Sequence, residues 1–334
     1  MRILPNKTVS IKQAAKMVED CLLYYDRGIF LANKPSKMVC QMSYSTSAQY
    51  ENFNILCKGI QRKLNMLRPP NSVHRLDKDT TGALLLARSP MWASRLQDQF
   101  NDGSIRKTYL ALVHGGSEKF RETSGVIETG MSEVDGRVRL DPLGKVTRTE
   151  WEVLGSSPKV PLTLMRLKLL TGHKHQLRVH LAKCLNAPVI GDPLYAKDVP
   201  PEEIKITRQI AASRKNMFLH ASEISFYRWT KERPIKRFEL SFRVPVPTKF
   251  DVVCRDSKIP VDRQLLLRQG RMFVNGQPWT EASYVYRESE KCWVSPELIP
   301  QEPTQVSQTD SENAVPARFK PYSQPHTEDK SNEL

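Results

Sequence analysis

The sequence predicts an α+β fold with a mostly antiparallel mixed sheet flanked by helices and loops. Its strand-like runs are joined by hairpins as well as by helices, without the regular alternation of strand and helix that a parallel sheet needs. The 334 residues, 39% of them hydrophobic, are enough for a hydrophobic core. No fixed-period repeat is present, and no apolar run reaches the roughly 18 residues that span a bilayer.

The amino-terminal segment, residues 1–20, is basic, and its first 18 residues contain no acidic residue. Such a start is compatible with a mitochondrial targeting sequence. It is equally compatible with a first helix that begins after Ser10 and carries an apolar face formed by Ala14, Ala15, Val18 and Leu22. Both interpretations stay open.

The remaining elements follow from apolar patterning and turn residues. In chain order we expect two short strands within 21–40, a partly helical stretch at 41–70, a buried strand at 82–87, a helix after 89, a strand at 107–113, hairpin and loop at 116–150, a half-buried strand at 162–170, a helix from 173 and a short strand at 189–192. The polar residues from about 303 onward are expected to be disordered.

Three of these elements have specific signals. The run GALLLA is continuously apolar and bounded by turn residues, which predicts a strand buried on both faces. Ser89 as N-cap, Pro90 in the first turn and Gly103 just past the end mark a helix. In the half-buried strand, apolar and basic residues alternate, so that Arg166 and Lys168 would form a basic outer face.

Charge and cysteine content narrow the function classes. The net charge is +15, and the last 34 residues are net −3, which leaves +18 on residues 1–300. A basic body of this size favours a polyanionic partner, with nucleic acid first and an anionic membrane surface second, although general solubility is an alternative. Six cysteines without a C-x-x-C pair argue against a zinc ribbon or a disulfide scaffold and indicate a reducing compartment.

The stretch NSVHRLDKDTTGALLLARS places His74, Arg75 and Asp77 directly before the buried strand. Charges beside a buried strand are costly unless they are paired or used. Asp77 lies between Arg75 and Lys78, and a carboxylate kept ionised by nearby cations suits a nucleophile or a base. On spacing alone, a structural ion pair or a turn cap is the better supported interpretation.

Other polar residues give weaker signals. His175 and His180 would point about 140° apart on a helix, and no glutamate lies between them as a zincin helix requires, so with His173 they do not predict a metal site. Arg178 can present its guanidinium to a carboxylate or a phosphate, and Tyr109 suits stacking on a base. Phosphate loops, dinucleotide fingerprints and the G-x-S-x-G elbow are absent.

Five segments together resemble the RluA-type pseudouridine synthases, over roughly residues 21–245. They are, in order, LLYYDRGIFLANKPSKMV, HRLDKDTTGALLLA, RKTYLALVHG, LLTGHKHQLRVHLAKCLNAPVIGDPLY and LHASEISF. The second is similar to the family signature that carries the essential aspartate. Five such segments in the family's order make the resemblance highly specific.

The resemblance implies that residues 21–250 are a pseudouridine synthase catalytic domain, an isomerase of uridines in ribosomal or transfer RNA. It implies no cofactor, no required metal and no membrane, and we expect a monomer. It assigns Asp77 as the catalytic residue, which replaces the structural interpretation of this aspartate. Arg178 would pair with Asp77, and Tyr109 would stack on the target base and assist proton removal from its C5 atom.

Three further residues receive binding roles from the resemblance. Leu177 would line the pocket, and His74 and Arg75 would shape the loop and help to hold the RNA. His173 and Lys174 depart from the family pattern, which has arginine and threonine there, but they largely keep its positive character. A lysine in that place is similar to some organellar members, and it favours a mitochondrial over a cytoplasmic location.

The carboxyl-terminal part is divided into an extension, residues 251–300, and a tail, residues 301–334. Residues 262–279 weakly resemble the core of a small RNA-binding module that many relatives carry at the amino terminus. An ordinary strand-turn-strand around Asn275 and Gly276 is the preferred interpretation.

Two rival functions belong to other classes. The first is an RNA-binding ribosome-assembly factor that keeps the fold while catalysis is dispensable. Intact Asp77, Tyr109 and Arg178 argue against it, because a protein that only binds RNA does not need this trio. The second is a basic scaffold that acts without nucleic acid, which would leave the charged motif at 74–79 unexplained.

Overall fold

The computed structural model describes residues 10–40, 48–211, 216–229, 234, 236–262, 265–266, 270–279, 285–287, 292–294 and 318–319. Its helices are α1 (Ile11–Cys21), α2 (Ala48–Lys63), α3 (Pro90–Asn101), α4 (Gln176–Val179), α5 (Pro201–Ala211) and α6 (Thr248–Asp256). A 3₁₀ turn (Ser117–Lys119) follows β5, and a π-helical turn (His180–Cys184) continues α4.

The strands are β1 (Leu22–Tyr25), β2 (Ile29–Lys34), β3 (Asn71–Ser72), β4 (Thr81–Ala87), β5 (Arg106–His114), β6 (Ser124–Val134), β7 (Arg137–Leu140), β8 (Lys145–Ser156), β9 (Leu162–Leu169), β10 (Leu219–Trp229), β11 (Arg237–Arg243), β12 (Arg271–Val274), β13 (Gln277–Pro278), β14 (Val285–Arg287), β15 (Cys292–Val294) and β16 (Arg318–Phe319).

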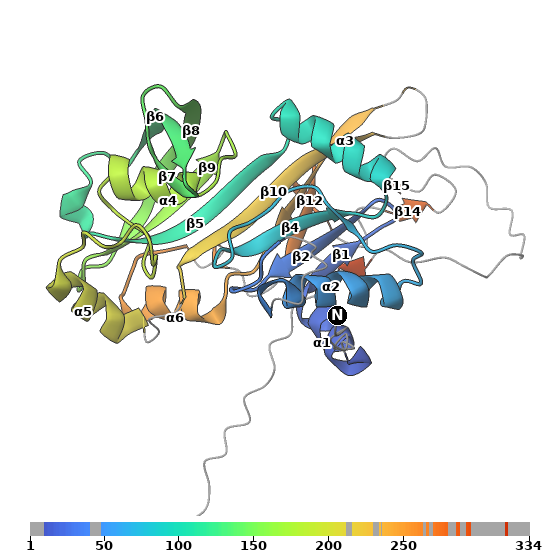
Figure 1. Cartoon of the computed structure of the whole chain (residues 1–334), viewed down its shortest axis with the longest axis horizontal. Coiled ribbons are helices and arrows are strands. Elements are labelled where there is room, and N and C mark those ends of the chain that lie inside the picture. The colour runs from blue at the N-terminus through green and yellow to red at the C-terminus, as the bar shows by residue number, and fades with distance from the viewer. Residues whose placement is uncertain are drawn as a thin grey trace, which may run out of the picture.

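One large mixed sheet organises the described residues. Its main path runs β16-β1-β2-β4-β10-β5-β9-β8-β6-β7, and β11 branches from β10 toward β12 and β13. The pairs are antiparallel except that β10 runs parallel to β4. The sheet extends from β1 and β2, beside α1 and α2, to an arm of β6, β7, β8 and β9 that carries α4 (Figure 1). The predicted α+β class with a mostly antiparallel sheet is confirmed.

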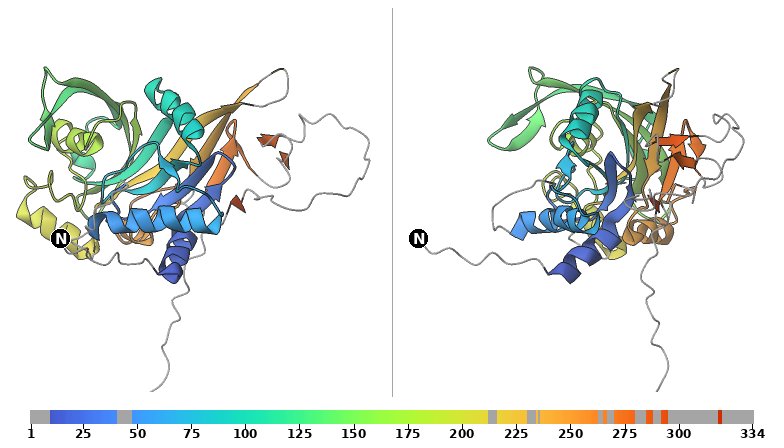
Figure 2. Two further views of the ribbon diagram at one scale, coloured as in Figure 1. Left: turned by 45° about the vertical axis from the view of Figure 1, so that its right-hand side comes forward. Right: turned by 90° about the vertical axis from the view of Figure 1, so that its right-hand side faces the viewer.

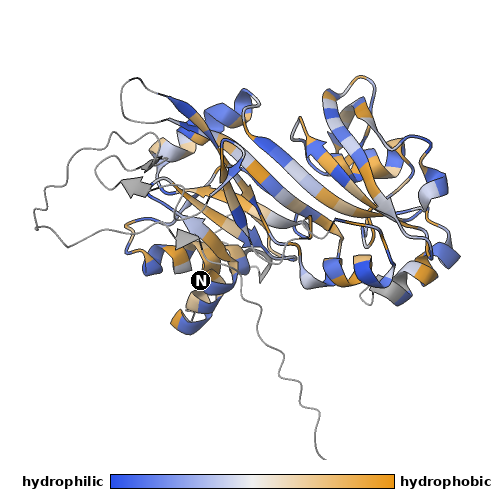
Figure 3. Cartoon of the chain, turned by 180° about the vertical axis from the view of Figure 1, so that it is seen from behind, coloured by the Kyte–Doolittle hydropathy of each residue, from blue (hydrophilic) through white to orange (hydrophobic). Residues whose placement is uncertain are grey.

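The centre of the sheet is the core. All seven residues of β4 are buried, as the continuous apolar run predicts. From behind, the central strands are largely hydrophobic, whereas α1 and α2 alternate between hydrophobic and hydrophilic residues (Figure 3). Gly82 is required where β4 meets β10, because its φ is +109° and a Cβ would lie 2.2 Å from the carbonyl oxygen of Ala221.

The first helix belongs to the packed body. Ala14 and Val18 are buried, as predicted, but Ala15 is exposed. A Cβ on Gly59 would lie 2.6 Å from Val18 Cγ2, so α1 and α2 cross at a glycine. Residues 11–21 therefore form part of the fold, and the mitochondrial interpretation of the segment stays a prediction.

Most of the other expected elements are found. The helix expected from 173 begins only at Gln176, because His175 has a positive φ, and two further differences occur. Residues 116–150 form long strands, because β6 pairs antiparallel with both β7 and β8. The β6–β7 hairpin projects beyond the body (Figure 2). The expected strand at 189–192 is wrong: Val189 forms only an isolated bridge with Val113, and the chain turns at Gly191 with a φ of +77°. A glycine at positive φ ends pairing at that point.

The carboxyl-terminal extension joins the same sheet. β12 pairs with β11, and the chain turns at Asn275 and Gly276 into β13, which agrees with the preferred strand-turn-strand interpretation. Residues 318–319 pair with β1 as β16. Apart from these two residues, the predicted disordered tail, 301–334, lies outside the described residues.

Candidate active site

A pocket of about 660 Å³ opens between α3, the loop before β4 and the arm. Its volume lies within the range of small-molecule binding sites. Asp77, Tyr109 and Arg178 line it together, although they are far apart in the sequence. Leu177, His74 and Arg75 also line it, so the pocket brings all six predicted site residues together.

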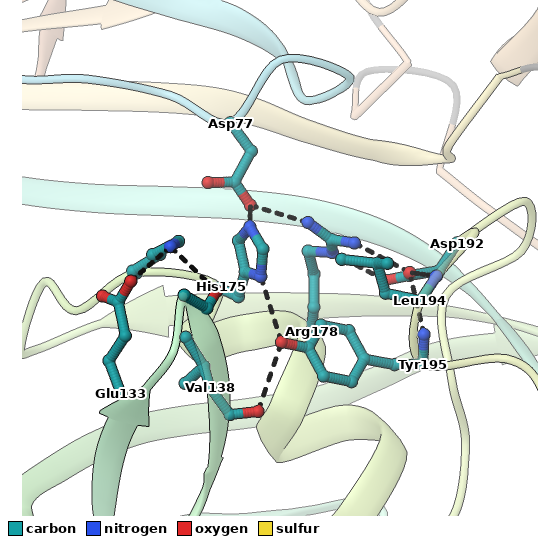
Figure 4. A network of polar contacts seen from close by, with 10 residues as sticks. Asp77, Glu133, Val138, His175, Arg178, Asp192, Leu194 and Tyr195 are labelled. Atoms are coloured by element: carbon teal, nitrogen blue, oxygen red, sulfur yellow. Dashed lines mark hydrogen bonds and ion pairs between the residues drawn. The ribbon is translucent and has the colours of Figure 1, made fainter.

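The loop before β4 presents Asp77 from one side of the pocket (Figure 4). The backbone carbonyl of Asp77 accepts a hydrogen bond from the Thr80 N–H at 3.1 Å, which makes a tight turn. The buried Lys34 holds this loop against β2, because its ammonium donates to the carbonyl oxygens of Pro35 and Met38, both at 2.9 Å, and of Lys78 at 3.0 Å. Burial lowers the pKa of Lys34 to about 8.

Arg178 faces Asp77 from α4. Its Nη1 lies 3.3 Å from Asp77 Oδ2, while its Nε and Nη2 donate to Asp192 Oδ2 and Oδ1 at 2.6 and 2.8 Å. Burial would lower the pKa of Arg178, but its hydrogen bonds and ion pairs with Asp192 and Asp77 raise it overall. The bidentate contact with Asp192 fixes the plane of the guanidinium, and the remaining nitrogen is directed at Asp77.

His175 completes the contacts around Asp77. Its Nε2 lies 4.0 Å from Asp77 Oδ2, and its Nδ1 is 3.0 Å from the Tyr195 hydroxyl (Figure 4). His175 has a φ of +54° at the start of α4, an uncommon backbone conformation for a residue other than glycine. Burial lowers the pKa of His175, against the opposing effect of the Asp77 charge.

Side-chain hydrogen bonds attach α4 and the π-helical turn after it to β8. Gln176 Nε2 donates to Thr149 Oγ1 at 3.0 Å, and His180 Nδ1 lies 3.0 Å from the same hydroxyl. His180 Nε2 lies 2.8 Å from Thr147 Oγ1, which itself donates to the Thr129 carbonyl. Only a neutral His180 that is protonated at Nε2 satisfies every partner, and burial lowers its pKa to about 4.

Tyr109 and Leu177 form apolar walls of the pocket. Tyr109 is buried on β5, and burial, together with the Asp77 charge, raises the pKa of its phenol. The phenol therefore stays protonated near neutral pH. This favours its predicted role as a stacking surface over its predicted role in removing a proton.

His74 and Arg75 differ from each other in their environments. His74 Nε2 accepts the Leu85 N–H at 2.9 Å, and burial, with the Lys107 charge nearby, lowers its pKa to about 3. His74 thus holds the loop against β4 as a neutral ring, as the shaping role predicts. Arg75 is exposed at the pocket, where a cation can reach an RNA phosphate.

The basic outer face expected on β9 is neutralised. Arg166 Nη1 lies 2.7 Å from Glu152 Oε2, and Lys168 Nζ lies 3.1 Å from Glu150 Oε2. The register of β8 places each glutamate directly opposite its cation. Arg166 and Lys168 do lie on the outer face of β9, but the opposing glutamates offset their charge, which the local pattern of one strand could not reveal.

Asp192, Tyr195 and Lys34 contribute to the site without having been predicted as site residues. Asp192 and Tyr195 lie in the GDPLY segment, and Lys34 lies in the NKP turn. Both segments belong to the resemblance, which is therefore the signal that could have identified these three residues. No cluster of three or more metal-ligating side chains occurs in the described part of the chain. Among those same residues, no helix is long and apolar enough to cross a membrane.

The chain resembles known RNA pseudouridine synthases in sequence and in fold. Residues 28–183 match the RNA pseudouridylate synthase family. An uncharacterized RNA pseudouridine synthase of Zymomonas mobilis is 32% identical over 235 residues, which cover 69% of this chain and 94% of that protein. Ribosomal large subunit pseudouridine synthase C of Rickettsia bellii is 32% identical over 64% of this chain and 66% of that protein.

Among solved structures, human RNA pseudouridylate synthase domain containing 4 has the same fold, with a TM-score of 0.56 at 23% identity over 74% of this chain and 96% of that one. The sequence matches place the chain among RNA-modifying enzymes. The chain belongs to the RNA pseudouridine synthase family, whose members are isomerases.

Proposed function

We propose that this protein isomerises specific uridines of ribosomal or transfer RNA to pseudouridine, with Asp77 as the catalytic carboxylate. One observation carries the assignment of the residue. The loop before β4 holds Asp77 in a pocket whose opposite side presents the Arg178 guanidinium at 3.3 Å and whose wall contains Tyr109.

The reaction requires a carboxylate in such a place. The N1–C1′ bond of uridine breaks, the uracil turns, and C5 bonds to C1′; the proton leaves C5 and N1 gains one, so the product is an isomer. Bond cleavage develops positive charge at the sugar, which Asp77 can stabilise as a nucleophile at C1′ or as a base at C2′. Arg178 and Asp192 fix the direction from which the carboxylate acts.

The pocket also suits a uridine taken out of its stack. A base stacked inside an RNA helix is inaccessible to Asp77, so the nucleotide must be flipped out of the RNA helix into the pocket. The Tyr109 ring offers a face that offsets lost stacking by about 1–3 kcal/mol. Leu177 and Leu76, which are both buried, line the same pocket and exclude water from the reacting sugar.

Ribosomal RNA is the first substrate to test, because the Rickettsia relative is named for the large ribosomal subunit. Transfer RNA is the second. A mitochondrial location is proposed over a cytoplasmic one on the basic, acid-poor residues 1–18 and on Lys174. Tagged protein followed through cell fractionation tests the location.

Pseudouridine mapping of total and organellar RNA, in cells with and without this protein, tests the function. Loss of one or a few defined pseudouridines, restored by the wild-type gene, is the expected result and names both substrate and compartment. If no pseudouridine is lost while RNA co-purifies with the protein, the assembly-factor function replaces this proposal.

A further inference from the structure

Lys107 is a half-buried cation in the pocket, two residues before Tyr109 on β5. Residues two apart on a strand share a face, and both residues line the pocket. The Lys107 ammonium lies 5.4 Å from the centre of the Phe100 ring. It also lies 3.3 Å from the place that a Cβ on Gly172 would occupy, beside the turn that leads into α4.

Lys107 differs from Arg178 and Lys174, two other cations of this pocket, in having no acidic partner among the described residues. Arg75 likewise has no ion pair among those residues, but it is exposed to solvent. Arg178 is paired with Asp192 and Asp77, and Lys174 is paired with Glu133. No described carboxylate lies within 4 Å of the Lys107 ammonium. Burial lowers its pKa without any opposing carboxylate, and the adjacent His74 ring is neutral.

A half-buried ammonium without a counter-charge costs free energy in the free protein. Such a group is stabilised when a bound anion supplies the missing charge. An aromatic ring and the turn at Gly172 lie beside this ammonium, and it donates no hydrogen bond to another described residue. Because Lys107 lines the pocket, an anion bound there can reach this ammonium.

We propose that Lys107 binds a backbone phosphate of the RNA, next to the uridine that enters the pocket. The inference rests on the proposed function, because it takes the occupant of the pocket to be an RNA nucleotide. A lysine acts on a phosphate as a compact point charge with three donors. Its place on the same face of β5 as Tyr109 puts this charge beside the stacked base, where the sugar–phosphate chain must leave the pocket.

The test compares Lys107→Met with Lys168→Met. Lys168 is an exposed lysine on the neighbouring strand, opposite Thr108 in register, and it lies outside the pocket lining. With a short oligouridine RNA as probe, Lys107→Met is expected to weaken binding about 10-fold or more. It should also reduce the slope of log Kd against log salt by about 0.7, the loss of one phosphate contact. Lys168→Met should change neither quantity.

Neutral linkages identify the phosphate. Oligouridines in which one linkage is a methylphosphonate lack one negative charge at a chosen position. At one position, the neutral linkage should weaken binding to the wild type and to Lys168→Met but not to Lys107→Met. Two results would overturn the proposal. One is that the loss of affinity from the neutral linkage is as large in Lys107→Met as in the wild type at every position. The other is an unchanged salt slope in Lys107→Met.

Measuring pseudouridine formation distinguishes a failure of the phosphate contact from a failure of the proposed function. Ribosomal and transfer RNA transcripts with tritium at C5 of uridine release tritium when pseudouridine forms. Lys107→Met should raise KM about 10-fold while kcat changes less than about threefold. Absence of release by the wild type would reject the proposed function, whereas normal KM in Lys107→Met would reject the phosphate contact alone.

Discussion

At the residue scale, the direction of the Arg178 guanidinium depends on Asp192. The Asp192 side chain is fully buried, and its two oxygens take two of the guanidinium nitrogens. Asp192 also accepts the backbone N–H groups of Leu194 and Tyr195. The segment after Gly191 therefore sets the angle at which Arg178 meets Asp77.

Asp192→Asn should impair both stability and catalysis. An amide of the same shape leaves the buried guanidinium with less charge compensation, and we expect a loss of about 3 kcal/mol in the free energy of unfolding. A guanidinium that is no longer fixed should lower kcat about 10- to 100-fold. Urea unfolding and tritium release measure the two effects.

Asp198→Asn is the matched control, because the Asp198 side chain is 77% exposed and pairs only with the exposed Lys183 among the described residues. This variant should retain stability within about 1 kcal/mol and full activity. An Asp192→Asn variant with the same unchanged kcat would show that Arg178 needs no second carboxylate.

The resemblance predicted which residues meet at the site better than it predicted their environments. Asp77 and Arg178 do pair, and Leu177 and Tyr109 do line the pocket. Asp192 was missed because its partner, fourteen positions earlier, is reached only when the chain turns at Gly191. His175 was considered only as a metal ligand, since its contact with Asp77 depends on the fold.

At the scale of elements, the segment around α4 carries residues that line the pocket and residues that bond to β8. Arg178, His175 and Gln176 line the pocket, and Gln176 also bonds to Thr149, as does His180. With only four helical residues before the π-helical turn, α4 has little stability of its own. Its position depends on these side-chain contacts.

Thr149→Val should loosen α4. The substitution keeps the shape but removes the hydroxyl that both Gln176 and His180 contact, which leaves two buried polar groups without that partner. We expect a loss of about 1–3 kcal/mol in stability, with a lower kcat because Arg178 moves with the helix. Thr123→Val is the control. Thr123 is exposed and directly precedes β6, so this variant should change neither stability nor kcat. Normal kcat in a destabilised Thr149→Val would contradict the positioning role of this contact.

Elements with strong local signals were predicted correctly. The helix after Ser89 begins with the expected cap, since the Ser89 hydroxyl accepts the Trp92 N–H, and Gly103 follows its end at a φ of +76°. The ion pairs of Arg166 and Lys168 could not be predicted, because the strand pattern does not reveal what the next strand carries. The register of β8 and β9 decides that charge.

At the scale of the whole molecule, buried neutral histidines make stability depend on pH. Burial lowers the pKa of His114, His180 and His220 to about 4. Each folded value lies below the unfolded value of about 6.5, so the unfolded chain binds more protons between these two values. The stabilising contribution is complete above pH 6.5 and is lost as the pH falls toward 4.

The free energy of unfolding should therefore fall between pH 6.5 and 4, by up to about 1.4 kcal/mol per pH unit for each of these histidines. Urea unfolding at several pH values measures the slope. His220→Gln removes one titrating group. It should therefore reduce the slope of unfolding free energy against pH by up to about 1.4 kcal/mol per pH unit, the contribution of one proton. A stability that is equal at pH 5 and pH 7.5 would contradict neutral burial of these residues.

Long-range pairing was the part of the whole fold that the sequence left open. Residues 251–300 were divided from the catalytic domain, yet β12 continues the sheet through β11. Likewise, α1 was separated as a basic segment, although Val18 packs into the main core. Composition reports local polarity and cannot show that a short apolar face has a partner far along the chain.

The central claim is that Asp77 carries out isomerisation, and the most direct measurement is pseudouridine formation by Asp77→Asn. The variant keeps the shape of the side chain and removes its charge. On ribosomal and transfer RNA transcripts with tritium at C5 of uridine, we expect release to fall to background, while RNA affinity stays within about threefold of the wild type. Normal release by Asp77→Asn would contradict the account.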